Sequence, residues 1–162
     1  MSDHCRAALE YAQEHRDHFL EDLKTFVRIP SISTDPAAKP EMRRAAEWVA
    51  DQLLDLGIEN VRIYPTTGHP VVFGEWLKAG ADQPTALIYG HYDVQPAEPL
   101  ELWHTPAFEP TLRGENLYGR GASDMKGQVT ASLKALEALV RTGSLPINLK
   151  FMIEGEEEIG SP

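Results

Sequence analysis

Segments with helical periodicity alternate along this chain with short segments of strand character. Apolar residues recur at helical spacing over about residues 3–28, 40–56 and 124–142. Gly57 follows the second of these segments and Gly143 follows the third, where each is expected as a left-handed helix terminator. The sequence therefore predicts three helices.

The predicted strands lie between and after these helices. Residues 61–64, 71–76 and 85–89 are rich in β-branched and aromatic residues and are bounded by glycine or proline. A brief strand is predicted at 117–119, and residues 147–153 alternate as a strand with one buried face does. Because helices alternate with strands, we expect an α/β fold. The proline-rich residues 95–114 are expected to form a long loop of the kind that has a functional reason.

The composition is that of one packed, acidic globular domain. The chain has 162 residues, 42% of them hydrophobic, and a formal net charge of −10. That charge disfavours nucleic acid and anionic membranes as partners. Cys5 is the only cysteine, so neither an internal disulfide nor a cysteine zinc site can form. With no signal peptide and no apolar run near the roughly 18 residues of a membrane span, we expect a cytoplasmic location.

The first cluster of chemically active side chains follows the strand predicted at 85–89. His91 and Asp93 are two residues apart, so a strand that continues this far points both side chains the same way. A carboxylate in that position can orient an imidazole that binds a metal. The alternative is an ordinary hydrogen-bonded pair at the end of a strand.

The second cluster, residues 119–127, lies between a short strand and the third helix. Asp124 stands at the predicted start of that helix, where it is either a helix cap or a ligand. A nucleotide-binding loop is excluded, because Gly119 and Gly121 are not followed by a third glycine at position 124 and Lys126 lacks the P-loop spacing.

The third cluster directly follows the strand predicted at 147–153. Glu154, Glu156, Glu157 and Glu158 place four carboxylates within five residues. Acidic runs are commonly solvated faces. At the end of a strand, however, crowded carboxylates repel one another, and a divalent cation relieves that repulsion.

Together the three clusters predict a metal centre. Two of them follow apolar strands and one opens a helix, and ligands bind at such positions in open α/β sheets. Oxygen and imidazole ligands without sulfur suit Zn²⁺, Mn²⁺ or Co²⁺ at a catalytic site with hydrolytic chemistry. His15 and His18 are expected on a solvated helical face instead, and Trp103 and Phe108 are expected to pack within the long loop.

These clusters resemble the N-terminal motifs of a family of zinc exopeptidases and deacylases. The family includes carnosine-type dipeptidases, acetylornithine deacetylase, succinyl-diaminopimelate desuccinylase, aminoacylase and carboxypeptidase G. Residues 26–33 and 103–110 are also similar to it, so the resemblance covers nearly the whole chain, and the dipeptidase branch is the most similar. The resemblance implies a catalytic domain with a central mixed sheet flanked by helices.

The resemblance also implies roles for five residues. His91 would bind one zinc ion, Asp93 would hold the His91 imidazole, and Asp124 would bridge two zinc ions. In the Glu-Glu-x-Gly-Ser pattern, Glu157 would be the general base and Glu158 a ligand of the second zinc ion. A metal-bridging water would give its proton to Glu157 and attack the amide bond of a dipeptide or small peptide.

Further expectations follow from the same resemblance. A cis peptide bond is expected between Asp124 and Met125. Family members are longer and carry two more metal ligands, so residues 1–162 are expected to be the N-terminal part of the catalytic domain. The remainder of that domain and a dimerisation or lid domain would be absent. We then expect an inactive fragment of a homodimeric enzyme.

Two alternative functions remain at this point. One is an N-acyl amino acid deacylase of the same family. The other is a non-catalytic divalent-metal-binding or regulatory remnant, which the acidic clusters and the net charge of −10 could support.

Overall fold

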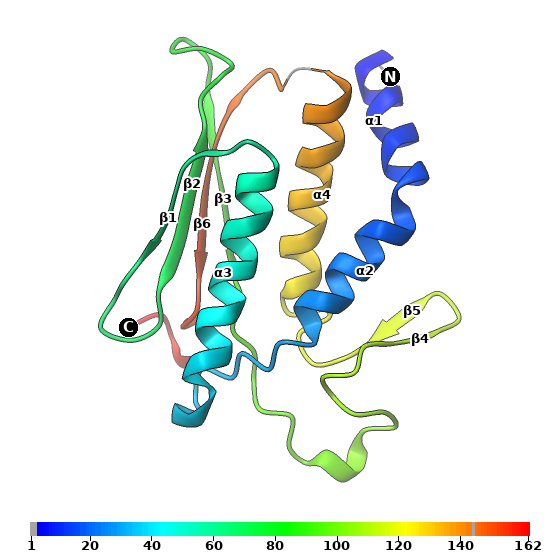
Figure 1. The fold of residues 1–162 in the computed structure, drawn as a ribbon, viewed down its shortest axis with the longest axis vertical. Helices are drawn as coiled ribbons and strands as arrows, with labels where there is room; N and C mark the ends of the chain where they lie inside the picture. Colours follow the sequence, from blue (N-terminus) through cyan, green and yellow to red (C-terminus); the bar gives the residue numbers. More distant parts are fainter. Residues whose placement is uncertain (1–2, 144) are drawn as a thin grey trace.

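The computed structural model describes residues 3–143 and 145–162, which form a mixed β-sheet with helices on one face (Figure 1). The strand order is β1-β2-β6-β3. The strands β1 (Glu59–Tyr64), β2 (Val71–Trp76) and β6 (Asn148–Glu154) pair antiparallel, whereas β3 (Thr85–His91) pairs parallel with β6. The predicted α/β class and the mixed sheet are confirmed.

The helices form two layers on that face of the sheet. α3 (Lys39–Asp55) and α4 (Lys126–Thr142) lie against the sheet, and α1 (Asp3–Glu14) and α2 (Arg16–Val27) pack against α4 (Figure 1). The inner helices bury the apolar residues of their helical period, each worth about 1.5–3 kcal/mol when fully removed from water. These residues include Met42, Val49 and Leu53 of α3 and Val129, Leu133 and Leu136 of α4.

The first predicted helix is two helices, α1 and α2, with a bend at His15. The His15 Nδ1 lies 2.8 Å from the main-chain oxygen of Tyr11, which also accepts the His15 main-chain N–H at 3.0 Å. A helix bends where a side chain competes with a main-chain N–H for the same helical carbonyl oxygen. The rings of Tyr11 and His15 stack with their centroids 3.9 Å apart, and this contact stabilises the bend. Periodicity alone did not show the interruption.

Both ends of α4 differ from the prediction. The helix starts at Lys126, and the residue in the capping position is Met125, so Asp124 is not the helix cap. Gly143 has an extended backbone with φ of 178°, so the prediction of a left-handed terminator is wrong there. A side chain at Gly143 would come within 3.0 Å of His4 Nδ1, so this glycine allows the start of α1 to approach closely. Gly57 is left-handed, with φ of 74°, as predicted.

The long loop contains a hairpin that was not predicted. β4 (Thr111–Arg113) pairs antiparallel with β5 (Asn116–Tyr118), which is the brief strand expected near 117–119. Each strand has three residues, too few for a period of two to be recognised. Before the hairpin, the Trp103 indole N–H donates to the Ala97 main-chain oxygen at 2.7 Å, as expected for a packing residue. Trp103 and Phe108 also line a cavity of about 680 Å³.

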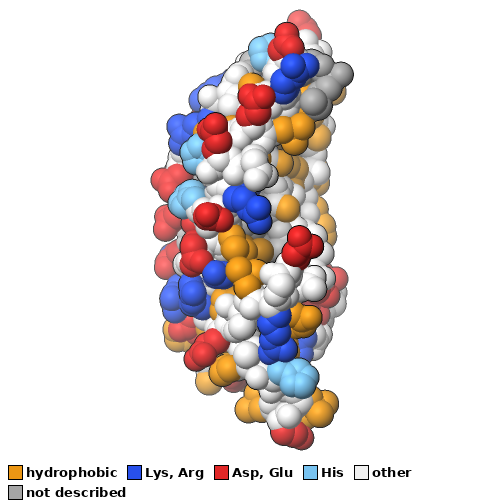
Figure 2. All heavy atoms as spheres, turned by 90° about the vertical axis from the view of Figure 1, so that its right-hand side faces the viewer, with side chains coloured by type: hydrophobic (Ala, Val, Ile, Leu, Met, Phe, Trp, Pro, Cys, Tyr) orange, Lys and Arg blue, Asp and Glu red, His pale blue; other side chains and the backbone are white. Residues whose placement is uncertain are grey.

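Three short 3₁₀ helices complete the described elements. They are η1 (Pro36–Ala38), η2 (Leu100–Leu102) and η3 (Glu157–Ile159). On the face shown in Figure 2, acidic and basic side chains are interleaved, and hydrophobic side chains lie in several separate groups, one of them at the lower end. Leu100 and Leu102 of η2 are exposed. No helix within the described residues is long and apolar enough to cross a membrane.

Candidate metal centre

The parallel pairing of β3 with β6 brings the first and third clusters together. His91 is in register with Glu154, so both strands end at the same edge of the sheet. The Tyr92 main-chain N–H then donates to the main-chain oxygen of Glu154 at 2.8 Å, which extends this pairing by one residue. Since ligands of open α/β sheets bind beyond the carboxyl ends of parallel strands, this edge is the expected place for a site.

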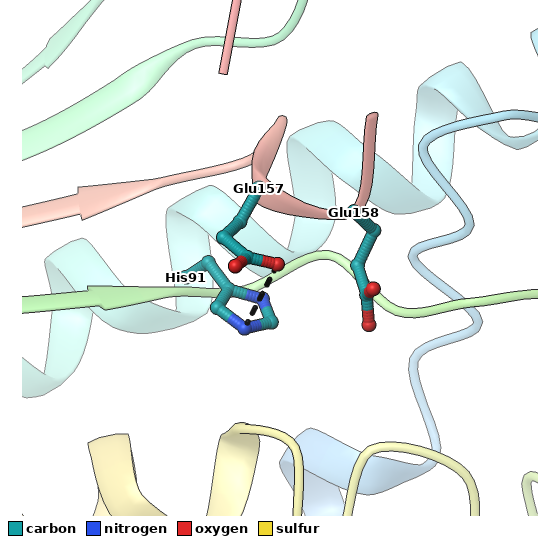
Figure 3. Close-up of side chains that lie close together, drawn as sticks. All are labelled: His91, Glu157 and Glu158. Atoms are coloured by element: carbon teal, nitrogen blue, oxygen red, sulfur yellow. Dashed lines mark ion pairs between the residues drawn. The ribbon is translucent and has the colours of Figure 1, made fainter. Parts of the chain in front are cut away.

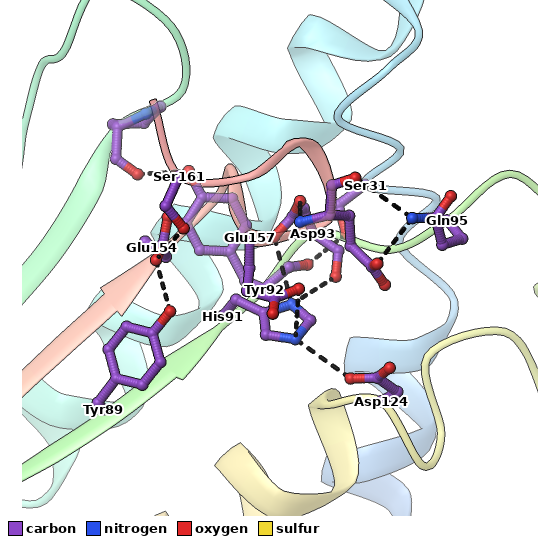
Figure 4. Close-up of polar contacts among 12 residues, drawn as sticks. Ser31, Tyr89, His91, Tyr92, Asp93, Gln95, Asp124, Glu154, Glu157 and Ser161 are labelled. Carbon is purple, nitrogen blue, oxygen red and sulfur yellow. Dashed lines mark hydrogen bonds and ion pairs between the residues drawn. The ribbon is translucent and has the colours of Figure 1, made fainter.

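His91 lies at the centre of the site and is 2% exposed (Figure 4). Its Nδ1 is 3.2 Å from Asp93 Oδ1 and 3.1 Å from the Asp93 main-chain oxygen. Its Nε2 is 3.2 Å from Asp124 Oδ1 and 3.8 Å from Glu157 Oε2. One ring nitrogen therefore faces a fully buried carboxylate and the other faces two acids, the arrangement of an imidazole held ready for a metal.

Glu157 and its neighbour Glu158 both reach this place from the η3 loop. His91, Glu157 and Glu158 each offer a ligand atom, and these atoms lie within 4.8 Å of one another (Figure 3). The Gln95 amide donates to Glu158 Oε2 at 2.8 Å, and the Glu158 main-chain N–H donates to Asp93 Oδ2 at 3.0 Å. Asp93 thus contacts both the imidazole and the loop that carries the glutamates.

The donor set suits a divalent metal ion. Asp124 and Glu157 approach His91 Nε2, and Glu158 offers a third carboxylate close to His91 and Glu157. Imidazole nitrogen with carboxylate oxygen is a common ligand set of catalytic Zn²⁺ and also suits Mn²⁺ and Co²⁺. Three acids that converge on one imidazole need a positive charge among them.

In the metal-free chain, a proton on His91 provides that charge. Burial lowers the pKa of His91, but the contacts and charge of Asp93, together with the charge of Glu157, raise it overall to about 9. Burial raises the pKa of Asp93, yet its contacts with His91 and the Glu158 N–H hold that pKa below its ordinary value. The electrostatics therefore favour a cation at this position, whether a proton or a metal.

The strand end that carries His91 is fixed by a buried serine. The Ser31 hydroxyl donates to the Tyr92 main-chain oxygen at 2.6 Å. The Val94 main-chain N–H donates to the main-chain oxygen of Ser31 at 2.9 Å. These two hydrogen bonds flank Asp93. The Tyr92 side chain points away from the site, and its hydroxyl donates to the Pro70 oxygen at 2.6 Å.

The remaining two glutamates of the third cluster have other partners. Glu154 Oε1 accepts from the Tyr89 hydroxyl at 2.6 Å and from the Ser161 hydroxyl at 2.9 Å, which closes the acidic loop (Figure 4). Glu156 Oε2 lies 3.4 Å from the Thr66 hydroxyl, in the turn between β1 and β2. Both residues therefore stabilise the loop, while Glu157 and Glu158 face the imidazole.

The five residues singled out from the sequence thus lie together at one end of the sheet. The Asp124–Met125 peptide bond is cis, as expected. Sequence reasoning did not identify Gln95, Ser31 and Lys126 as residues that support the site. Lys126 is fully buried. A signal for Lys126 existed, because it shares a helical face with Val129 and Leu133, which are core residues.

Sequence and structure comparisons identify relatives over most of the chain. Residues 87–162 match the family model described as peptidase family M20/M25/M40. A Cys-Gly metallodipeptidase of Candida albicans is 35% identical over 164 residues, covering 92% of this chain and 34% of that protein.

Two crystal structures share the fold. Human carnosine dipeptidase 1 has a TM-score of 0.87 and 36% identity, over 96% of this chain and 35% of that chain. The M20 family metallo-carboxypeptidase of Sulfolobus solfataricus has a TM-score of 0.80 and 38% identity, over 88% of this chain and 32% of that chain.

The five residues proposed from the sequence for the metal centre all lie in the matched segment. The relatives are about three times as long, since this chain spans about a third of their length. The matched family segment contains His91, Asp93, Asp124, Glu157 and Glu158, and the fold agrees over nearly the whole chain. From these matches, residues 87–162 carry the sequence pattern of peptidase family M20/M25/M40, and most of the chain shares its fold with the M20 metallo-carboxypeptidase and with human carnosine dipeptidase 1.

Proposed function

We propose that the protein is a metal-dependent hydrolase that cleaves the amide bond of dipeptides or other small peptides. The observation that carries this proposal is the convergence on His91 Nε2, with Asp124 Oδ1 at 3.2 Å and Glu157 Oε2 at 3.8 Å. The substrate class follows the relatives, whose names describe a Cys-Gly metallodipeptidase and a carnosine dipeptidase.

We assign His91, Asp124 and Glu158 as the residues that would hold the metal, which we propose to be two zinc ions. The same nitrogen and oxygen donors would also accept Mn²⁺ or Co²⁺. The bound metals would supply Lewis-acid chemistry, lowering the pKa of a water and polarising the amide carbonyl. Asp93 orients the His91 ring so that Nε2 faces the metal, and it is supported in this by its 3.2 Å contact with Nδ1.

Glu157 is the proposed general base. Its carboxylate lies beside the proposed ligands, and its side chain is 45% exposed, so substrate and water can reach it. In this role Glu157 takes the proton of the attacking water and returns it to the leaving amine. Glu158, the next residue, is held by Gln95 and is more buried, which suits a ligand better than a base that must exchange protons.

The proposal is tested by metal titration of this chain and by hydrolysis assays on a protein of its relatives' length that contains these residues. Calorimetric titration with Zn²⁺ should show binding that Asp124→Ala greatly weakens, and the zinc-loaded longer protein should hydrolyse Cys-Gly or β-Ala-His. Absence of metal binding would refute the metal centre. Hydrolysis of N-acyl amino acids alone would favour a deacylase, and metal binding without any hydrolysis would favour a non-catalytic module.

A further inference from the structure

Lys126 lies on the first turn of α4 with no solvent exposure. Its ammonium donates to the main-chain oxygens of Phe26 at 3.1 Å and Ile29 at 2.6 Å, and it lies 4.9 Å from the Phe26 ring centroid. These oxygens lie at the carboxyl end of α2, where a helix leaves carbonyls without helical partners and its dipole favours a cation. The side chain therefore ties the start of α4 to the end of α2.

Asp124 depends on this attachment because its own side chain has little support. The carboxylate is 77% exposed, and its one contact among the described residues is the 3.2 Å approach to His91 Nε2. Its position is therefore set by the main chain that leads into α4. Two residues later that main chain is anchored by Lys126, whose N–H also donates to the Gly121 oxygen at 3.0 Å.

The same attachment continues to the strand that carries His91. Ile29 O accepts from the Ser31 N–H at 2.9 Å as well as from Lys126. Ser31 in turn is hydrogen-bonded to Tyr92 and Val94, on either side of Asp93. A short series of buried contacts thus connects the helix start that presents Asp124 with the strand end that presents His91.

We propose that Lys126 is a positioning residue of the metal centre, which sets the separation of Asp124 and His91 by tying the start of α4 to residues 26–31. The inference rests on the proposed function, because there Asp124 and His91 are metal ligands. Groups that orient metal ligands typically change metal affinity by about 10–100-fold when they are removed.

Lys134 provides a matched control on the same helix. It is 8% exposed, and its ammonium contacts Asp22 at 2.5 Å, Glu137 at 3.0 Å and the Gln52 side-chain oxygen at 2.9 Å. Lys134 therefore connects α4 with α2 and α3, whereas Lys126 connects α4 with the end of α2. Lys134 lies about two helical turns further from Asp124. Loss of Lys134 should lower stability without changing the metal centre.

The test compares the full chain with its Lys126→Met, Lys126→Arg and Lys134→Met variants, each at a temperature where circular dichroism shows it folded. Zn²⁺ affinity is measured by calorimetry, and the coordination geometry by the visible absorption of bound Co²⁺. Lys126→Met should weaken Zn²⁺ binding by about 10–100-fold and alter the Co²⁺ spectrum. Lys126→Arg should recover part of the affinity, and Lys134→Met should keep the parent affinity and spectrum.

Two results would overturn the inference. One is a Lys126→Met variant with the parent affinity and spectrum, and the other is an equal loss in Lys134→Met. If Lys126→Met does not fold, Lys126→Gln and Lys134→Gln are compared by the same criteria. A parent protein that binds no Zn²⁺ removes the proposed function together with this inference, whereas a binding parent with an unaffected Lys126 variant removes the inference alone.

Discussion

At the scale of single residues, the site is defined by what faces each nitrogen of His91. Asp93 is buried beside Nδ1, and the exposed carboxylates of Asp124 and Glu157 approach Nε2. The two sets of acids therefore have different consequences. Asp93 affects the orientation and charge of the imidazole, while the acids at Nε2 are in reach of a ligand from solvent.

Glu157→Gln should separate catalysis from metal binding. The amide keeps the size of the side chain but cannot accept the proton of the attacking water, so kcat should fall by about 10²–10⁴-fold. Zn²⁺ affinity should change little, because Glu157 is not one of the proposed ligands. Steady-state hydrolysis of a dipeptide and calorimetry measure the two quantities, on a protein of the relatives' length that contains these residues.

Glu156→Gln is the matched control for that substitution. Its carboxylate lies toward Thr66 in the turn between β1 and β2, one residue away from Glu157 in the chain. The kcat of the Glu156→Gln variant should remain close to that of the parent protein. Near-normal turnover of Glu157→Gln would remove Glu157 as the base.

The stability of the metal-free chain should fall as pH rises from about 6.5 to about 9. The pKa of His91 is raised from 6.5 to about 9 in the folded state, so in this window the folded state binds more protons than the unfolded state. The stabilisation is fully present below pH 6.5, and its loss amounts to about 3 kcal/mol. Denaturant unfolding of the chelator-treated protein across this range measures it. The His91→Gln variant should lack this part of the pH dependence, and identical pH profiles would contradict the assignment.

At the scale of elements, the parallel neighbours β3 and β6 create the site by ending at one edge of the sheet. The loop after β6 can approach β3 closely because residue 155 is glycine. A Cβ at Gly155 would lie 2.3 Å from the hydroxyl oxygen and ring carbon Cζ of Tyr92, a ring that is fully buried and cannot move away freely. Glycine at this position is therefore a packing requirement of the acidic loop.

Gly155→Ala should destabilise the fold and disturb the metal centre together. The expected cost is about 1–3 kcal/mol, as for other insertions of a methyl group into a packed interior. Zn²⁺ affinity should fall as well, because the displaced loop carries Glu158. Thermal unfolding and calorimetry measure both effects.

A double-mutant cycle identifies the cause of that cost. In a Tyr92→Leu background, which removes the ring atoms nearest to Gly155, the alanine should cost less. An equal cost in both backgrounds would show that contact with Tyr92 is not the reason.

Most elements could be predicted from the sequence because their periods are long enough to recognise. The residues of α3 and β6 carry clear periods, and β2 is marked by β-branched and aromatic residues. The predicted bounds of all three agree within about one residue. The β4–β5 hairpin and the bend at His15 were missed, since one has very short strands and the other depends on a side chain contacting its own helix. Gly143 was predicted wrongly because its role is to allow contact with α1, which no local pattern reveals.

The residues of the candidate site also differ in how far the sequence predicts them. Side chains that stand at the ends of strands could be singled out, because position along the chain determines which sheet edge they reach. Ser31 and Gln95 could not, since they act through hydrogen bonds to distant main-chain or side-chain atoms. The helical face of Lys126 could be predicted, but the main-chain oxygens that its side chain contacts could not. Such partners are determined by tertiary packing.

At the scale of the whole molecule, the metal centre lies where three separate parts of the chain meet. The end of β3 presents His91, the segment leading into α4 presents Asp124, and the η3 loop presents Glu158 (Figures 3 and 4). A metal bound there would link the helical layer to the sheet. Its binding free energy would then stabilise the folded chain, by an amount that increases with metal concentration.

X-ray absorption at the zinc edge of the zinc-loaded full chain tests this account most directly. The account predicts nitrogen and oxygen ligands at about 2.0–2.2 Å, with the outer scattering of an imidazole that is lost in His91→Ala. Sulfur at about 2.3 Å, or an imidazole signal that persists in His91→Ala, would contradict it.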